Sequence, residues 1–556
     1  MNTNDVNVNK IFSEAIKNHK DNNFNVAEKL YKKILKIDPI HFNSTFYLAS
    51  LFAQIRNFSK AKELFEKAIK IKPNYALAYS NLGAVLKELG NFEDSLLACE
   101  RAIKIEPNNA LAYANLGAVL RELGKFKDSV DACEKAIKIQ SNNLGALHNL
   151  ALSLVGMNEI KKAMSCYKML SKIQTNPGNA YQNLGKLNVM IGEKKEAINF
   201  YQLAIKHEPE NLSYYHSLSD LDENILDENL KVKINNIIAK DKNNNQNIAY
   251  ANFLLSKYEL NSKNYQSEFS YLINGHNYYV ESRKKGYSHD VDYWLNKLPK
   301  NEELNKSINV IKKTTSSLEN PTPIFIVGVP RCGSTLTEKI IASGSQFITI
   351  GEEIGLLSSF VKEKIIRKKS IFSDIENSRT ELINKYKQSN LLKKKSNYIF
   401  TDKTLDNFFY INLIRAIFPN AKIINCVRDP LLSIMSIVKN HFPTVSWCHN
   451  IEHIFKYFDI YYKKIESFNK LFPNYIYKLD LKKLSNEPIK ESKKLMKFCN
   501  LPWNQKCLEF YKRKDLISKT TSNVTLRQKI YKQSSEKYLP YKNLLKKYGD
   551  KYSWFN

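Results

Sequence analysis

The sequence lacks the paired cysteines that zinc cages and disulfide frameworks require. Its eight cysteines are scattered over 556 residues without a C-x-x-C pair, which predicts neither kind of site. Long apolar runs are missing too, since no segment reaches the roughly 18 apolar residues of a membrane span. The polar start Met1–Asp5 is unlike a signal peptide. We therefore expect a cytoplasmic protein with reduced thiols and no membrane span.

Acidic residues are too few to balance the basic ones. The chain has 85 Lys and Arg against 55 Asp and Glu, a formal net charge of +30. This balance suits polyanions in general, including nucleic acid, acidic lipid, a bisphosphorylated nucleotide or an acidic peptide, although lysines on solvated helix faces also account for it. The composition, 43% hydrophobic and 25% charged, is that of a globular protein, and the length allows two to four domains.

The first 220 residues repeat with a period of 34. The stretch Ala78–Gly83 recurs as Ala112–Gly117 and again, two periods later, as Ala180–Gly185. A turn glycine and a second, alanine-bearing helix follow each copy, which is typical of tetratricopeptide (TPR) repeats. Residues 1–220 are therefore predicted to form an all-α TPR superhelix with a concave surface. We interpret its recurring tyrosines mainly as packing residues.

Residues 221–320 are predicted to connect this solenoid to the next domain. An Asn- and Lys-rich loop around Lys240–Asn245 precedes two amphipathic stretches, Ile248–Leu260 and Tyr265–Lys284. Their spacing predicts a helical hairpin.

After Pro323 short apolar runs alternate with helical patterns. Ile324–Val327 and Ile423–Val427 are predicted to be buried parallel strands, each followed by a loop and a helix. Residues 321–556 should thus form an α/β domain with a parallel sheet, binding ligands at the carboxyl ends of its strands.

The loop after the first of these strands lacks the lysine of nucleoside-triphosphate P-loops. Gly328 and Gly333 keep the spacing of G-x-x-x-x-G-K-[ST], but Ser334 stands where the lysine should be. Backbone N–H groups and the start of the next helix can still hold a phosphate-like group. Contact with a third phosphate and its Mg²⁺ is lost.

Four motifs in order resemble a known family. They are the loop just described, Gly351–Glu353, Asp402–Lys403 and Cys426–Pro430. Together they resemble sulfotransferases that use 3′-phosphoadenosine-5′-phosphosulfate (PAPS), most closely the tyrosylprotein sulfotransferases and their bacterial TPR-containing relatives. The resemblance covers about residues 320–550 and implies a P-loop-like, metal-independent transferase.

The resemblance assigns the nucleotide contacts residue by residue. Arg331 and the loop positions Cys332, Gly333, Ser334 and Thr335 would hold the 5′-phosphosulfate. The 3′-phosphate would lie between Arg428 and Ser436, and a C-terminal segment with Ser522 and Arg527 would close over the nucleotide.

The same resemblance assigns the catalytic groups. Glu353 matches the base, and Glu352 is its alternative, because one residue is inserted between the loop and Gly351. Lys403 matches the lysine that stabilises the transferring group, and Arg331 and Ser522 are expected to assist. A helix N-cap role for either glutamate is the structural alternative.

Two positions depart from the family pattern. Leu481–Leu484 replaces a Tyr-Glu-x-Leu segment, which puts a tyrosine contact to the nucleotide in doubt. Asn440 stands where the tyrosylprotein enzymes have an arginine, with Lys439 beside it as a candidate replacement.

Other interpretations stay open at this stage. His449–His453 fits the H-x-x-E-H zinc pattern, although a third ligand is not identifiable, and Asp429 could be a Walker-B acid. A P-loop kinase and a TPR scaffold with an inactive α/β domain are the rival functions. We expect sulfuryl transfer to a hydroxyl, foremost tyrosine in a peptide or protein bound by the TPR groove. A carbohydrate or small molecule is the alternative acceptor, and nucleic acid is not expected.

Overall fold

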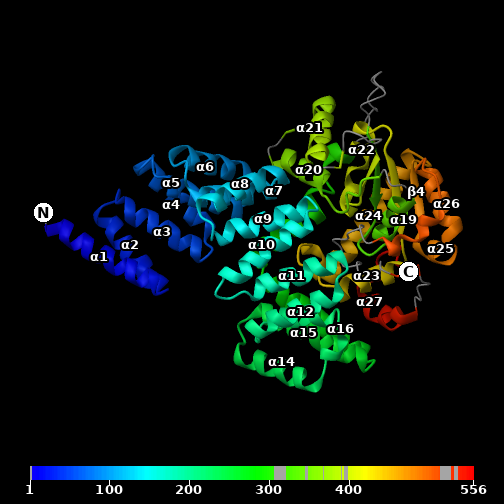
Figure 1. Cartoon of the computed structure of the whole chain (residues 1–556), viewed down its shortest axis with the longest axis horizontal. Coiled ribbons are helices and arrows are strands. Elements are labelled where there is room, and N and C mark those ends of the chain that lie inside the picture. The colour runs from blue at the N-terminus through cyan, green and yellow to red at the C-terminus, as the bar shows by residue number, and fades with distance from the viewer. Residues whose placement is uncertain are drawn as a thin grey trace. The chain divides into compact units, whose positions relative to one another are not determined.

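The structure is a computed structural model that describes residues 3–305, 321–344, 348–366, 369–389, 391–392, 399–513, 528–530 and 536–555 (Figure 1). The chain divides into two compact units, Met1–Thr175 and Asn176–Asn556. This division falls inside the repeat region, so the boundaries at 220 and 320 remain predictions from the sequence.

The first unit consists of helix pairs, and in two of them a glycine lets the helices pack closely. Gly83 faces the next helix so closely that a Cβ would lie 2.7 Å from Cys99 Sγ, and at Gly117 the distance to Cys133 Sγ is 2.3 Å. The predicted TPR fold is confirmed. Its helices are α1 (Thr3–Lys20), α2 (Phe24–Ile37), α3 (Phe42–Gln54), α4 (Phe58–Ile71), α5 (Ala76–Glu88), α6 (Phe92–Ile105), α7 (Ala110–Glu122), α8 (Phe126–Ile139), α9 (Leu144–Gly156) and α10 (Ile160–Ile173).

The second unit begins with helices that continue the repeat. Gly185 lets α11 approach Tyr201 of α12, since a Cβ would lie 2.3 Å from the ring. The helices that precede the sheet are α11 (Gly178–Ile191), α12 (Lys194–His207), α13 (Leu212–Ser219), η1 (Glu223–Ile225), α14 (Glu228–Lys240), α15 (Asn245–Asn261), α16 (Tyr265–Glu281), α17 (Lys284–Asp292), η2 (Tyr293–Lys297) and α18 (Glu302–Asn305).

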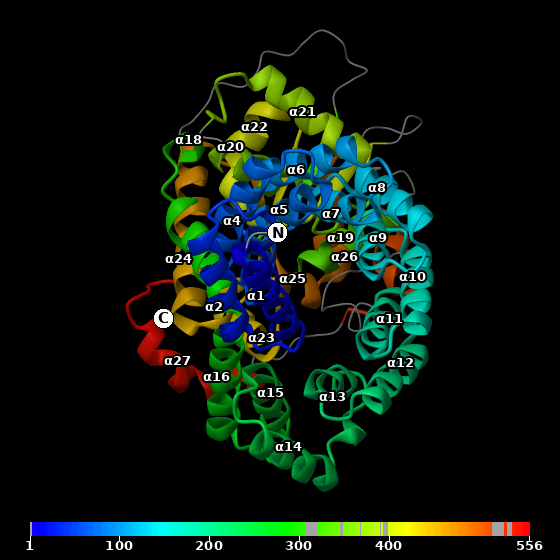
Figure 2. The same cartoon turned by 90° about the vertical axis from the view of Figure 1, so that its left-hand side faces the viewer.

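Helices α15 and α16 confirm the predicted hairpin, and Figure 2 shows them side by side. Besides linking the solenoid to the sheet, these helices contribute to the core beneath the sheet. Phe253, Leu272 and Tyr279 belong to the same buried apolar cluster as the strand residues Phe325 and Ile424. The hairpin is therefore part of the core that supports the sheet.

The sheet has four parallel strands among the described residues, in the order β2-β1-β3-β4. They are β1 (Thr322–Val327), β2 (Ile399–Asp402), β3 (Lys422–Val427) and β4 (Ile476–Asp480). The predicted strands β1 and β3 lie next to each other at its centre, with neighbours added on opposite sides. Since ligands bind where the strand order reverses in this way, the carboxyl ends of β1 and β3 are the expected site.

Helices connect and cover these strands. They are α19 (Ser334–Gly344), α20 (Leu356–Ile366), α21 (Ile375–Gln388), η3 (Leu405–Tyr410), α22 (Ile411–Ile417), α23 (Pro430–Lys439), η4 (Ser446–His449), α24 (Ile451–Leu471), α25 (Leu481–Asn486), α26 (Pro488–Phe498), η5 (Gln505–Leu508), η6 (Phe510–Lys512), η8 (Glu536–Tyr541) and α27 (Lys542–Gly549).

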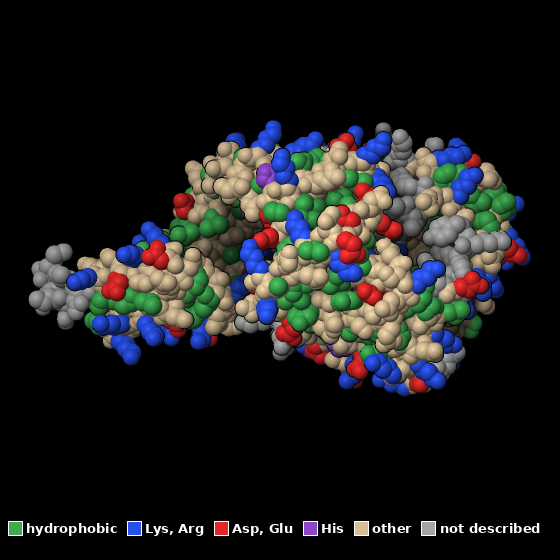
Figure 3. Space-filling view, turned by 90° about the horizontal axis from the view of Figure 1, so that it is seen from below, with side chains coloured by type: hydrophobic (Ala, Val, Ile, Leu, Met, Phe, Trp, Pro, Cys, Tyr) green, Lys and Arg blue, Asp and Glu red, His purple; other side chains and the backbone are tan. Residues whose placement is uncertain are grey.

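The face shown in Figure 3 carries charges of both signs. On the face shown in Figure 3, Lys and Arg side chains alternate with Asp and Glu rather than gathering in one patch. Within the described ranges, no helix combines the length and the hydrophobicity that crossing a membrane requires.

Candidate functional site

The loop between β1 and α19 is shaped by three residues with positive φ. Gly328 has φ +154°, Arg331 has φ +69° and Gly333 has φ +94°. At Gly333 the reason is also steric, because a Cβ would lie 2.7 Å from Leu481 Cδ1. Leu481, which stands in the departing Leu-Lys-Lys-Leu segment, thus packs under the loop. The glycine lets the loop turn into α19 at Ser334.

Two arginines and a serine from separate elements converge at this loop. The Arg331 Nε–H donates to Ser436 Oγ over 2.9 Å, and Arg428 Nη1 donates to the Arg331 carbonyl over 3.0 Å. Ser436 lies on α23, and Arg428 follows the end of β3. The structure therefore brings together three residues that the sequence places up to 105 positions apart, and their donors suit an anion.

The remaining loop residues are buried. Cys332 points into the protein, Ser334 and Thr335 open α19, and all three side chains are inaccessible or nearly so. A hydrogen bond with Cys426 lowers the pKa of the Cys332 thiol, and the Lys403 ammonium adds to this effect.

The Gly351–Glu353 segment runs along the outer edge of β2. Thr401 N–H donates to the Thr349 carbonyl over 3.0 Å, and Lys403 N–H donates to the Glu352 carbonyl over 2.8 Å. Gly351 is essential for this approach, because a Cβ there would lie 2.1 Å from the Thr401 carbonyl oxygen. The segment therefore acts as a short extension of the sheet.

Glu353 faces Lys403 directly. Lys403 Nζ lies 2.8 Å from Glu353 Oε1, with the lysine side chain 0% exposed and that of the glutamate 46% exposed. Burial opposes the charge on Lys403, but three carboxylates, led by Glu353, outweigh it and raise the pKa of the ammonium. The pair therefore joins a permanently charged cation to an accessible carboxylate at the carboxyl end of β2.

Glu352 points the other way. It has φ +53°, and its side chain, 6% exposed, pairs with Lys339 of α19 at 2.8 Å. Neither glutamate is an N-cap, since α20 begins later, at Leu356. Of the two candidates for the base, Glu353 is the one whose carboxylate is accessible.

Sequence reasoning missed two charged residues behind this segment. Glu338 and Lys339 are buried on α19 and contact Glu352. The available signal was a charged pair directly before the apolar run Ile340–Ala342.

Three residues for which the sequence left another functional role open make structural contacts. Asp429 caps α23, accepting from Leu432 N–H over 3.3 Å, and Lys439 pairs with Glu268 of α16 at 2.7 Å. His449 precedes α24 instead of sharing its face with His453, and it bonds to His276. In the part of the chain that the structure describes, no three His, Cys, Asp or Glu residues form a metal-binding group.

Ser522 and Arg527 lie outside the described residues.

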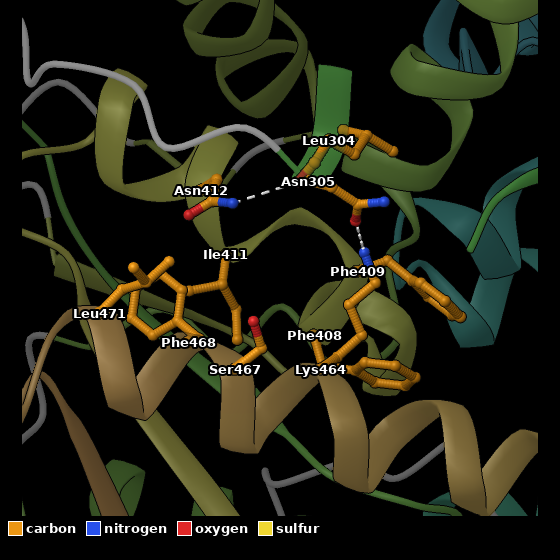
Figure 4. Close-up of a pocket in the computed structure, with 10 residues that line it drawn as sticks. All are labelled: Leu304, Asn305, Phe408, Phe409, Ile411, Asn412, Lys464, Ser467, Phe468 and Leu471. Carbon is orange, nitrogen blue, oxygen red and sulfur yellow. Dashed lines mark hydrogen bonds between the residues drawn. The ribbon is translucent and has the colours of Figure 1, made fainter. Parts of the chain in front are cut away.

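A separate cavity of about 100 Å³ lies between η3, α22 and α24 (Figure 4). Asn412 Nδ2 donates there to the Leu304 carbonyl over 3.2 Å, and Lys464 donates to Asn305. None of the predicted site residues lines this cavity.

Comparison with known families agrees with both parts of the chain. Residues 323–505 match the model described as "Sulfotransferase family". Models of tetratricopeptide repeats match residues 51–90, 76–109, 110–143 and 178–211. The chain thus carries a sulfotransferase-family domain and TPR repeats.

Relatives of longer or shorter length match parts of the chain. An uncharacterized protein of Aquifex aeolicus (strain VF5) is 33% identical over 241 residues, which are 40% of this chain and 31% of that protein. The chain therefore spans about a third of the curated relative. The crystal structure of MamA is 27% identical, covering 28% of this chain and 90% of its own, with a TM-score of 0.26. PilF of Pseudomonas aeruginosa is 19% identical, covering 38% and 97%, with a TM-score of 0.34.

Proposed function

We propose that this chain, with its sulfotransferase-family domain and TPR repeats, transfers the sulfuryl group of PAPS to a hydroxyl, foremost that of a tyrosine in a peptide or protein. The observation that carries the proposal is the pair Glu353–Lys403, with its 2.8 Å contact, at the sheet edge that also presents the Arg331 loop. A base can remove the proton of a hydroxyl that attacks sulfur, and a cation beside it can stabilise the negative charge that develops during the transfer.

The residues present fit PAPS. Arg331, Arg428 and Ser436 supply donors for two anionic groups, and Ser334 replaces the lysine that a triphosphate requires. When bound, PAPS supplies an activated sulfuryl group whose leaving group is a 3′,5′-bisphosphate nucleotide.

Each residue then has a defined task. The Glu353 carboxylate accepts the proton of the acceptor hydroxyl, which its accessible position allows. The Lys403 ammonium stabilises negative charge that develops between donor and acceptor. Arg331 holds the donor at the loop, and Arg428 with Ser436 holds its 3′-phosphate.

A matched peptide pair tests the acceptor and the reaction together. The protein is incubated with PAPS and a tyrosine peptide, or with the same peptide carrying phenylalanine, and mass spectrometry follows the addition of one sulfuryl group. We expect modification of the tyrosine peptide alone. Release of 3′-phosphoadenosine-5′-phosphate with a carbohydrate or small phenol, but with neither peptide, would move the acceptor to that class. No release with any hydroxyl would contradict sulfuryl transfer.

A further inference from the structure

Behind the proposed base lies a buried polar cluster to which the reaction assigns no task. It joins Glu338 and Lys339 of α19 to Glu352 and to Thr401 of β2. Glu338 is 0% exposed, and the other three side chains are buried as well. Burying charged groups costs free energy unless they are paired and hydrogen-bonded. A buried cluster of this kind therefore suggests a structural or functional role.

One oxygen of Glu338 collects the hydrogen bonds that fix the Gly351–Glu353 backbone. Glu352 N–H donates to Glu338 Oε1 over 3.1 Å, and Thr401 Oγ1–H donates to the same atom over 2.6 Å. Thr401 Oγ1 in turn accepts from Gly351 N–H over 3.2 Å. Two successive backbone N–H groups of the segment therefore depend on Glu338, one directly and one through the threonine.

These bonds hold Glu352 in a conformation that non-glycine residues rarely adopt. Its φ of +53° is left-handed, and such a conformation persists only where the surroundings impose it. The turn sends Glu352 inward to Lys339 and the next side chain, Glu353, outward to Lys403. The direction of Glu353 thus follows from the backbone that Glu338 fixes.

The second oxygen of Glu338 supports a neutral carboxyl. Glu338 Oε2 is buried and has no hydrogen-bond partner among the described residues. The charged groups that face this carboxyl are Lys339 on its own helix, Glu352 on the edge segment and Lys403 after β2. Burial first, and the Glu352 carboxylate second, raise the pKa of Glu338 to about 7. A protonated Glu338 can keep both bonds at Oε1 as a carbonyl would.

We infer that Glu338 is a positioning residue, which holds the left-handed turn at Glu352 and so aims the Glu353 carboxylate at Lys403 and the acceptor hydroxyl. The inference rests on the proposed function for its effect on catalysis, but not for its effect on the backbone. Glu338 lies on the helix that begins at the donor loop. The same helix therefore sets the positions of both the donor and the base.

The test compares Glu338→Ala with the isosteric Glu338→Gln. Gln keeps an acceptor oxygen for Glu352 N–H and Thr401, whereas Ala removes it. We expect Glu338→Ala to lower kcat by about 10- to 100-fold, because small misplacements of a reacting group have effects of this size. KM for PAPS should stay within about twofold, and Glu338→Gln should restore kcat to within about threefold. Glu491→Ala, which removes a buried acid of α26 far along the chain, is the control.

Amide hydrogen exchange tests the effect of Glu338 on the Gly351–Glu353 backbone and does not depend on enzymatic activity. Glu338→Ala, and independently Thr401→Val, should accelerate exchange in a peptide spanning residues 349–357, and Glu338→Gln should not. Unchanged exchange in both Glu338→Ala and Thr401→Val would overturn the inference. So would a folded Glu338→Ala protein with wild-type kcat, or one in which KM for PAPS rises as kcat falls. If the wild-type protein transfers no sulfuryl group, the proposed function is wrong. The exchange experiment still tests the structural role of Glu338 in that case.

Discussion

At the residue scale, two adjacent glutamates have opposite surroundings. Glu352 is buried against Lys339, whereas Glu353 is half exposed against Lys403. A base must reach the proton that it removes, which only an accessible carboxylate can do. The same geometry makes Glu352 a structural residue, since its charge is balanced inside the protein.

Glutamine substitutions should separate these two roles. Glu353→Gln is expected to lower transfer by about 10²-fold or more with nucleotide affinity retained, which is the usual scale for loss of a general base. Glu352→Gln should lower the free energy of unfolding by about 3 kcal/mol, because it leaves the Lys339 charge buried without its partner. Activity assays and urea unfolding measure the two effects, with the exposed Glu452→Gln as control. A reversed pattern would make Glu352 the base.

The raised pKa of Glu338 predicts a pH dependence of stability. The folded protein holds this proton up to about pH 7, whereas the unfolded chain releases it near the ordinary value of 4.5. Stability is therefore fully present below pH 4.5, falls as pH rises to about 7, and is flat above it.

Glu338→Gln has no proton to lose and should lack this contribution. The stability of wild type relative to the variant should fall by about 1 to 3 kcal/mol between pH 4.5 and 7.5. Urea unfolding at several pH values measures the difference. A constant difference across this range would show that Glu338 is ionised in the folded protein.

Sequence motifs assigned Arg331 to one anion site and Arg428 with Ser436 to a second, and hydrogen bonds connect these three residues in the structure. The direction of the two glutamate side chains was not predictable. It depends on the sign of one φ angle at Glu352, which is set by bonds to Glu338 and Thr401 that are distant in sequence. The catalytic and nucleotide-binding roles themselves stay predictions.

At the scale of elements, the α15–α16 hairpin supports the helix that carries Ser436. Glu268 of α16 pairs with Lys439 at the end of α23 over 2.7 Å, and His276 contacts the Val438 carbonyl over 2.9 Å. Phe253 and Leu272 complete the attachment through the shared apolar core. The proposed nucleotide site and the hairpin should therefore be stable only together.

A pair of truncations tests this dependence. A fragment that begins near Pro321 lacks the hairpin and should expose its apolar core, so we expect aggregation and no cooperative unfolding. A fragment that begins at Asn176 keeps the hairpin and should unfold cooperatively on heating. Circular dichroism and calorimetry measure both. A cooperative Pro321 fragment that binds the bisphosphate nucleotide as tightly as the full chain would contradict the role of the hairpin.

Hydrophobic periodicity was sufficient to predict this hairpin and the central strands β1 and β3. Hydrophobic periodicity could not predict what the hairpin packs against, because it shows which face of a helix is apolar but not which element covers that face. The pairing of Thr349 with β2 was equally hidden, since it joins residues about 50 positions apart through backbone atoms.

At the scale of the whole molecule, the compact unit Asn176–Asn556 contains all described site residues. The other unit carries TPR helices, whose stacking generally creates elongated binding surfaces. The proposed functions of donor binding and acceptor selection thus belong to different parts of the chain.

The Asn176 fragment separates these two tasks. Its Kd for 3′-phosphoadenosine-5′-phosphate should equal that of the full chain, since both proposed anion sites lie within it. Its kcat/KM for tyrosine peptides should fall by at least about tenfold, because remote contacts that orient the hydroxyl are lost. Steady-state kinetics with both proteins measure the effect. Unchanged peptide kinetics would favour a small-molecule or carbohydrate acceptor.

The most direct measurement of the central claim is calorimetric titration of the full chain with 3′-phosphoadenosine-5′-phosphate and, separately, with ATP and Mg²⁺. The two anion sites proposed at Arg331 and at Arg428–Ser436, together with a loop that lacks the P-loop lysine, predict a Kd at least about tenfold lower for the bisphosphate nucleotide. Arg428→Ala should remove most of that preference. Equal or tighter binding of Mg·ATP would contradict the account and favour a kinase.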